Sequence, residues 1–215
     1  MNGPFSDPVA VWPRADDPGP PLVVLLHDRG SDERSILGLA DHLPDGPAYA
    51  SVRAPIAEGG GYAWFANRGI GRPVASSLAQ TMAWFRSWLA DVAGASRPVV
   101  LVGFSGGAAF AGGLLLDSPD RFAGTAILYG TLPFEAGVPT TAGRLDDVPV
   151  FVAHGDDDHV IPRELLDRTW SYLHDTAGAD VRDARGPGGH GITPQVATAL
   201  GAWLVDVTEP RTAAP

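Results

Sequence analysis

The sequence predicts an α/β protein built on a doubly wound, mostly parallel sheet. Short, uninterrupted apolar segments, such as LVVLLH at 22–27 and PVVLVGF at 98–104, are typical of strands buried on both faces. Longer segments between them carry apolar residues at helical spacing. Strands that alternate with helices form parallel sheets with right-handed connections, and their ligands bind beyond the carboxyl ends of the strands.

In the first half of the chain, the strand at 22–27 is followed by an expected helix at 32–43 and a strand at 49–52. Residues 59–71 are rich in glycine and predict a loop, which also carries three aromatic side chains. The next helix is expected to begin at Ser77. Its apolar residues recur at helical spacing, Ser77 and Gln80 can form a capping box, and Gly94 lies beyond its end.

In the second half, the strand at 98–104 leads into a helix at 106–117, and strands are expected at 124–130 and 148–154. Pro162 suits the first turn of a helix that runs to about 176, and 179–184 reads as an edge strand. A final helix carries an apolar stripe that consists of Val196, Leu200, Trp203, Leu204 and Val207.

The length of 215 residues, with 45% hydrophobic residues, suits one compact domain. We expect this domain to cover 1–208 and the polar end, 209–215, to be a disordered tail. The stretch between the strands ending near 130 and beginning near 148 is too short for a lid domain.

The charge balance disfavours polyanionic partners. Acidic residues outnumber basic ones by 25 to 15, and a net charge of -10 repels nucleic-acid backbones and anionic lipid surfaces. No apolar segment approaches the length that spans a bilayer, and no basic stretch followed by an apolar run resembles a leader. We therefore expect a cytoplasmic protein that neither enters membranes nor binds nucleic acid. The absence of cysteine excludes a thiolate nucleophile.

The segment GFSGG at 103–107 matches the GxSxG pattern directly after an expected buried strand and directly before a helix. This context predicts a nucleophile elbow, in which a tight, strained turn projects Ser105 from the top of the sheet. The amide of Gly106 would then be one oxyanion donor at the start of the helix. For the pentapeptide alone, the alternative is that the glycines only permit close packing and the serine is a helix cap.

A serine nucleophile needs a histidine base, which in turn needs a carboxylate, and in sheets of this kind the chain order is serine, acid, histidine. Of the six histidines, His27 and His154 end strands, His42 and His174 lie on expected helices, and His159 directly follows the aspartates. That leaves His190, in the glycine-rich loop before the last helix.

The acid should follow the strand at 148–154, where HGDDDHVIP offers Asp156, Asp157 and Asp158. Position alone does not separate the three. Acidic residues ahead of a helix are also common as solvated caps. A metal cluster is less favoured, because carboxylate-rich calcium loops usually show wider, alternating spacing.

Five segments together resemble the phospholipase/carboxylesterase group of α/β-hydrolases: LLHDRGSDE, RAPIAEGGGYAWF, GFSGG, HGDDDHVIP and GGHG. The resemblance covers about 20–205 and implies the α/β-hydrolase fold without a lid domain. Its HGxxDxxxP pattern implies that Asp158 is the acid, with Asp157 the fallback. Its HGxG turn implies that the amide of Arg29 is the second oxyanion donor. The segment RAPIAEGGGYAWF implies that Trp64 and Phe65 line a substrate pocket, although burial in the core is an equal alternative.

Two positions depart from the family pattern. Asp28 stands where the family has glycine, so either the turn has another shape or aspartate adopts a left-handed conformation there. Its carboxylate would oppose an oxyanion unless it points away or pairs, for example with Arg29. Gly106 replaces the glutamine of many relatives, which keeps the backbone donor.

The sequence thus predicts a serine hydrolase that cleaves carboxylic esters of short to medium acyl or aryl groups, or thioesters, through an acyl-enzyme. Ser105, Asp158 and His190 are its predicted catalytic residues, and no metal or organic cofactor is required. The expected partner is a small-molecule ester, and a homodimer is left open. The alternative is a catalytically silent α/β-hydrolase fold that binds a ligand or a protein.

Overall fold

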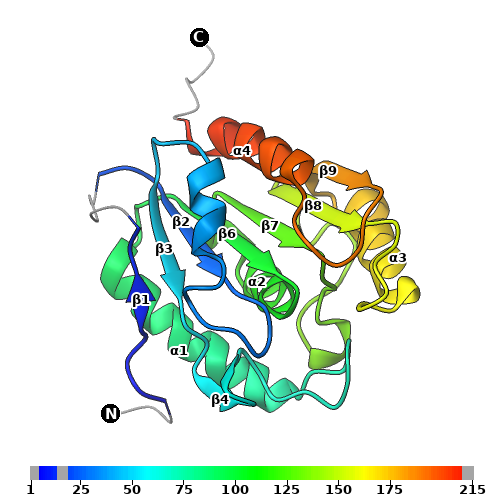
Figure 1. The fold of residues 1–215 in the computed structure, drawn as a ribbon, viewed down its shortest axis with the longest axis horizontal. Coiled ribbons are helices and arrows are strands. Elements are labelled where there is room, and N and C mark those ends of the chain that lie inside the picture. The colour runs from blue at the N-terminus through cyan, green and yellow to red at the C-terminus, as the bar shows by residue number, and fades with distance from the viewer. Residues whose placement is uncertain (1–4, 14–18, 210–215) are drawn as a thin grey trace.

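A seven-stranded sheet, in the order β1-β3-β2-β6-β7-β8-β9, forms the centre of the computed structural model, which describes residues 5–13 and 19–209 (Figure 1). All neighbouring strands are parallel except β1, which is antiparallel to β3. This confirms the predicted mostly parallel α/β sheet. The strands are β1 Ala10–Val11, β2 Leu22–Leu26, β3 Ala48–Val52, β6 Val99–Phe104, β7 Gly124–Leu128, β8 Pro149–Gly155 and β9 Asp180–Gly186.

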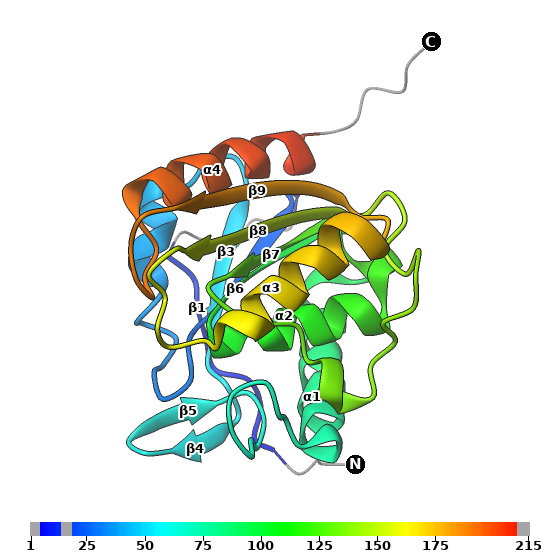
Figure 2. The same ribbon diagram turned by 90° about the vertical axis from the view of Figure 1, so that its right-hand side faces the viewer.

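Helices cover both faces of the sheet. The helices α1 (Ala75–Ala93) and α2 (Gly106–Asp117) lie on one face, and η1 (Leu37–His42) and α4 (Pro194–Thr208) on the other (Figures 1 and 2). The helix α3 (Arg163–Ser171) continues into a π-helical turn, η4 (Tyr172–Thr176), and two short 3-10 turns complete the set, η2 (Pro119–Arg121) and η3 (Phe134–Ala136). None of the helices in the described part of the chain is long and apolar enough to cross a membrane.

Strand β2 illustrates why the strands read as unbroken apolar segments. All five of its residues are buried. Leu22, Val24 and Leu26 pack in the cluster of α1 and α2, whereas Val23 and Leu25 pack in the cluster of η1 and α4. Since successive side chains of a strand point to opposite faces, a strand covered on both sides needs an apolar residue at every position.

Two local expectations were wrong. The helix expected at 32–43 is reduced to the 3-10 helix η1. Within and beside the expected loop at 59–71, the chain forms a hairpin of β4 (Ile56–Glu58) and β5 (Gly61–Ala63), whose two-residue turn consists of Gly59 and Gly60 at positive φ. The short strand β1 was not expected.

The predicted capping box at Ser77 was also wrong. Helix α1 begins two residues earlier, after Val74, and the Ser77 hydroxyl accepts a hydrogen bond from the amide of Ala66 at 2.8 Å. The hydroxyl therefore ties the aromatic loop to the helix. The helix ends at Gly94 with φ 55°, as expected. Of the predicted disordered tail, 210–215 lie outside the described residues.

The sheet brings several loops to one edge. Strand β2 lies between β3 and β6. The chain leaves β2 toward β3, and the later strands, beginning with β6, extend the sheet on the opposite side of β2. At such a switch point the loops after the two strands diverge and leave a crevice. The loops that follow β2, β6, β8 and β9 all emerge at this carboxyl edge, because the four strands are parallel.

The sheet and helix α2 approach each other most closely at two glycines. A Cβ atom on Gly103 would lie 2.3 Å from the carbonyl oxygen of Gly107, and one on Gly107 would lie 2.1 Å from that of Leu26. Both distances are shorter than any non-bonded contact between such atoms, so only glycine allows this packing of β2, β6 and α2.

We expect Gly103→Ala to lower the free energy of unfolding by about 2 kcal/mol or more, because overpacking against fixed backbone forces strand and helix apart. Gly46→Ala is the matched control, since a Cβ atom there meets nothing within 4 Å. Urea denaturation of both variants measures the difference. Equal stability of the two would show that the elbow tolerates a wider spacing.

Candidate active site

Ser105 occupies the sharp turn between β6 and α2. Its backbone has φ 54° and ψ -111°, a conformation that is strained for a residue with a side chain. The amide of Ser105 donates to the carbonyl of Leu128 at 2.9 Å, which holds the turn against β7. The hydroxyl makes no capping bond to α2, so the helix-cap alternative does not apply.

The hydroxyl of Ser105 faces His190. The distance from Ser105 Oγ to His190 Nε2 is 2.9 Å, and His190 Nδ1 lies 2.8 Å from Asp158 Oδ2. Because an ionised carboxylate only accepts hydrogen bonds, the proton of a neutral imidazole is on Nδ1, which leaves Nε2 to accept from the serine. The structure therefore brings together the three residues that the sequence proposed, from the loops after β6, β8 and β9.

Asp158 is the one buried member of the three aspartates. Its side chain is 0% exposed, and Oδ1 accepts hydrogen bonds from the amides of Val160 and Ile161 at 2.9 and 3.1 Å. Burial raises the pKa of the carboxyl, but the hydrogen bonds from His190 and the two amides outweigh burial, so the pKa lies below its ordinary value.

The two other aspartates point elsewhere. Asp156 is exposed and its Oδ1 lies 2.6 Å from Arg185 Nε, a contact that lowers its pKa. Asp157 is exposed. Within residues 5–13 and 19–209, no group of three or more histidines and carboxylates is arranged to hold a metal ion.

Three of the five histidines that were set aside, His27, His154 and His174, make contacts away from Ser105 and Asp158. His27 is fully buried and has both ring nitrogens within hydrogen-bonding distance of backbone, Asp28 O at 2.7 Å and Ala54 N at 3.1 Å. Burial lowers its pKa. His174 Nε2 lies 3.0 Å from Asp183 Oδ2, on the surface. His154 is buried against Trp170, with their ring centres 5.1 Å apart.

The turn after β2 meets the start of α2 beside Ser105. A Cβ atom on Gly106 would lie 3.1 Å from the amide nitrogen of Arg29, so the two amides of the predicted oxyanion site are neighbours. The Arg29 guanidinium is turned away to the β4–β5 hairpin, where it pairs with Glu58 and donates to the carbonyl of Phe65 at 2.9 Å.

At Asp28 the structure rules out one of the two alternatives for the backbone and the pairing that was suggested for the side chain. Asp28 does not adopt a left-handed conformation; the positive φ in this turn, 86°, belongs to Gly30. It does not pair with Arg29 either, because that guanidinium is held by Glu58. Instead, the hydroxyl of Ser31 donates to Asp28 Oδ2 at 2.9 Å.

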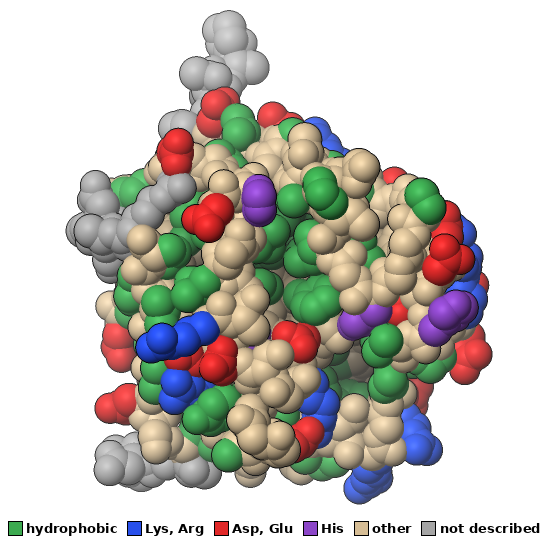
Figure 3. Space-filling view, in the orientation of Figure 1, with side chains coloured by type: hydrophobic (Ala, Val, Ile, Leu, Met, Phe, Trp, Pro, Cys, Tyr) green, Lys and Arg blue, Asp and Glu red, His purple; other side chains and the backbone are tan. Residues whose placement is uncertain are grey.

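A cavity of about 290 Å³ opens beside Ser105. Figure 3 shows the face on which this cavity and a neighbouring one open; it is hollowed near its centre, where hydrophobic side chains gather beside a histidine. The cavity is lined by Ser105, His190, Arg29 and Gly106 together with mainly apolar residues from three loops: Phe65, Ile70, Pro73, Leu132, Pro133, Val160 and Ile161. Except for Phe65, these apolar residues were not foreseen, although each lies in or beside a loop that follows a strand.

The assignment of Trp64 to a substrate pocket is corrected by its burial. Its side chain is 1% exposed and its ring stacks on Phe110, with centres 4.6 Å apart. Its indole nitrogen donates to the carbonyl of His27 at 2.8 Å. Trp64 therefore belongs to the core, and only Phe65 of the two predicted aromatic residues lines the cavity.

Comparisons with known proteins agree with this fold. A model of the phospholipase/carboxylesterase family matches residues 13–204. The protein MhqD of Bacillus subtilis strain 168 is 25% identical over 187 residues, which cover 85% of this chain and 91% of MhqD.

Solved structures are similar over nearly the whole chain. The Bacillus cereus carboxylesterase superposes with a TM-score of 0.79 at 23% identity, covering 92% of this chain and 93% of that one. The structure of esterase PE8 superposes with a TM-score of 0.72 at 28% identity, covering 87% and 92%.

We expect Asp158→Asn to lower the free energy of unfolding at pH 7 by about 1–3 kcal/mol, because the amide side chain cannot accept all three hydrogen bonds. The pKa of Asp158 is lowered on folding, so its carboxylate stabilises the protein above the ordinary carboxyl pKa of about 4. This contribution disappears as the pH falls through the lowered value.

Urea denaturation of the wild type and the variant from pH 7 to pH 3 measures the difference, which should narrow toward acid pH. Asp157→Asn is the control, because this side chain is exposed. A difference that stays constant over the whole pH range would contradict the assigned role of the carboxylate charge.

Proposed function

Since the chain belongs to the phospholipase/carboxylesterase family of hydrolases, we propose that it cleaves carboxylic esters of small molecules through a covalent acyl-enzyme on Ser105. The proposed substrates carry short to medium acyl or aryl groups. The same attack extends to thioesters, because a thiolate is also a competent leaving group. The proposed reaction uses side chains and backbone amides of this chain, together with water.

The observation that carries the proposal is the continuous hydrogen-bonded path from Ser105 through His190 to Asp158, with links of 2.9 and 2.8 Å. A serine hydroxyl is a weak nucleophile unless a base takes its proton. Nε2 of His190 faces the serine. Asp158 fixes the tautomer in which the proton is on Nδ1, so that Nε2 can accept the proton of the serine. The positive φ of Ser105 and the unused capping position leave its oxygen free for attack.

In the proposed reaction, Ser105 Oγ forms a bond to the carbonyl carbon of the ester while its proton moves to His190 Nε2. The carbonyl oxygen becomes an oxyanion, for which the amides of Arg29 and Gly106 are the proposed donors. The intermediate then expels the alcohol, which receives the proton from His190. Water then attacks the carbonyl carbon of the acyl-enzyme while one of its protons moves to His190 Nε2. The second intermediate breaks its bond to Ser105 Oγ, which takes the proton from His190, and the acid is released.

The 290 Å³ cavity is the proposed acyl site. It contains Ser105 and the amide-bearing residues Arg29 and Gly106, and its remaining walls are largely apolar. Ile70 and Val160 are 44% and 49% exposed at its margin, so a longer chain would pass between them into solvent. The apolar surface that the acyl chain buries in the cavity therefore increases with chain length only up to a limit.

A folded protein that binds esters without cleaving them is the alternative, and the Asp28 carboxylate beside the proposed oxyanion site favours it. A fluorophosphonate probe separates the two. The probe labels an activated serine far faster than an ordinary one, so labelling that requires both Ser105 and His190 would support the enzyme.

We expect the wild type to hydrolyse p-nitrophenyl esters and Ser105→Ala to lose this activity. Rates should rise from acetate through the medium-chain esters and then level off or fall by decanoate, as the apolar cavity fills. Initial rates across the series measure this, with circular dichroism to verify the fold of the variant. Undiminished turnover by folded Ser105→Ala would refute the nucleophile.

We expect Asp158→Asn to reduce turnover on the order of a thousandfold, because the histidine then lacks the partner that fixes its tautomer and stabilises its charged form. Asp157→Asn should leave turnover unchanged, since its side chain is exposed and lines neither the hydrogen-bonded path nor the cavity. Steady-state kinetics on the best p-nitrophenyl ester compares the two. The reverse outcome would move the acid to Asp157.

A further inference from the structure

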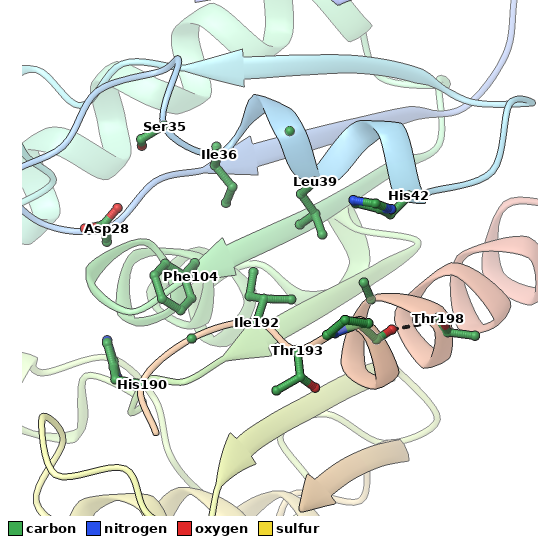
Figure 4. Close-up of a pocket in the computed structure, with 14 residues that line it drawn as sticks. Asp28, Ser35, Ile36, Leu39, His42, Phe104, His190, Ile192, Thr193 and Thr198 are labelled. Atoms are coloured by element: carbon green, nitrogen blue, oxygen red, sulfur yellow. Dashed lines mark hydrogen bonds between the residues drawn. The ribbon is translucent and has the colours of Figure 1, made fainter. Parts of the chain in front are cut away.

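A second and wider cavity, of about 650 Å³, adjoins the site on the far side of His190. It lies between η1 and the segment that leads from His190 into α4 (Figure 4). Ser105 does not line it. Two residues, Asp28 and His190, line both this cavity and the smaller one. In Figure 4 they lie at the same end of the wider cavity, on opposite sides of it.

The position of His190 indicates which part of an ester would occupy this cavity. In the proposed reaction His190 returns its proton to the oxygen of the leaving alcohol, so that oxygen must lie next to the imidazole. The smaller cavity holds the serine and takes the acyl group. The alcohol portion then extends past His190 toward the wider cavity.

The Asp28 carboxylate in this cavity has no cationic partner within the described part of the chain. Among residues 5–13 and 19–209, the only side chain that donates a hydrogen bond to this carboxylate is Ser31, on Oδ2. The nearest guanidinium in the sequence, that of Arg29, is held by Glu58. A negative charge that no cation of the described chain compensates, in the lining of a cavity, favours a ligand that carries a positive charge.

The wall beside this carboxylate is apolar and partly aromatic. Ile36, Leu39 and Ile192 line the cavity together with the ring of Phe104, which is not fully buried. Figure 4 shows Phe104 between Asp28 and His190. A quaternary ammonium group is attracted both by a carboxylate and by the face of an aromatic ring, and it needs apolar surface around its methyl groups.

We propose that the wider cavity is the alcohol subsite and that Asp28 selects esters of cationic amino alcohols. The proposal rests on the proposed esterase function and names the substrate class of that site. Such a substrate also removes an electrostatic conflict. Asp28 lines the cavity that holds Ser105, where its charge opposes the oxyanion, and a bound ammonium group would offset that charge.

The test compares two isosteric esters, butyrylcholine and 3,3-dimethylbutyl butyrate, which differ in having nitrogen or carbon at one position. We expect the wild type to have a kcat/KM about fivefold or more higher for the choline ester. Asp28→Asn should bring the ratio close to one. Raising the salt concentration should reduce the wild-type preference, because the charge is partly exposed.

Asp41→Asn is the matched control: it removes the same charge from η1 but lines neither cavity, so it should keep the wild-type ratio. If Asp28→Asn does not fold, the effect of salt on the wild-type preference for the choline ester still tests the proposal. A wild type that cleaves both esters equally at low salt, or a variant with an unchanged ratio, would overturn the proposal while leaving the esterase function intact. A folded wild type that cleaves neither these esters nor the p-nitrophenyl series would overturn both.

Discussion

The close approach of strands β2 and β6 to helix α2 determines the geometry of the whole site. Gly103 and Gly107 lack the Cβ atoms that would collide with backbone there, so the chain can turn from β6 into α2 within one residue. That residue is Ser105, which takes the positive φ that this turn requires. The same contact brings the turn after β2 against the start of α2, so the amides of Arg29 and Gly106 become neighbours. One packing constraint therefore positions both the proposed nucleophile and its proposed oxyanion donors.

Much of the sheet could be predicted from the sequence because its strands are buried on both faces. Strands such as β2 then need an apolar residue at every position, which is a strong pattern. Local structure that depends on tertiary contacts could not be read in this way. Ser77 looked like a helix cap but accepts a hydrogen bond from the amide of Ala66 in the loop, and of the helix expected at 32–43 only the 3-10 helix η1 (Leu37–His42) forms. The pair Gly59–Gly60 is typical of a two-residue hairpin turn, but it was not recognised as one because 59–71 contains several other glycines.

The serine and the histidine of the candidate site could be predicted from the sequence, since the chain order and the elbow pattern leave few choices. The choice among three consecutive aspartates could not, because it depends on which side chain the turn buries. Asp158 is enclosed and bonded by two amides, whereas Asp156 reaches outward to Arg185. Trp64 shows the same limit, since only the packing on Phe110 distinguishes a core indole from its neighbour Phe65 at the cavity.

Two aspartates near His190 show how surroundings decide what a carboxylate can do. Asp158 is enclosed and accepts three hydrogen bonds that outweigh the cost of its burial, so its pKa falls and it stays charged at neutral pH. Its charge is already committed to His190 and cannot serve a ligand. Asp28 accepts one side-chain hydrogen bond and faces two cavities. Any group that reaches it from solvent meets a charge that no cation of the described chain compensates. In the proposed function, the group that enters those cavities is a substrate. In the proposed function the two carboxylates therefore have separate roles: Asp158 acts on the histidine, and Asp28 acts on the alcohol that the histidine protonates.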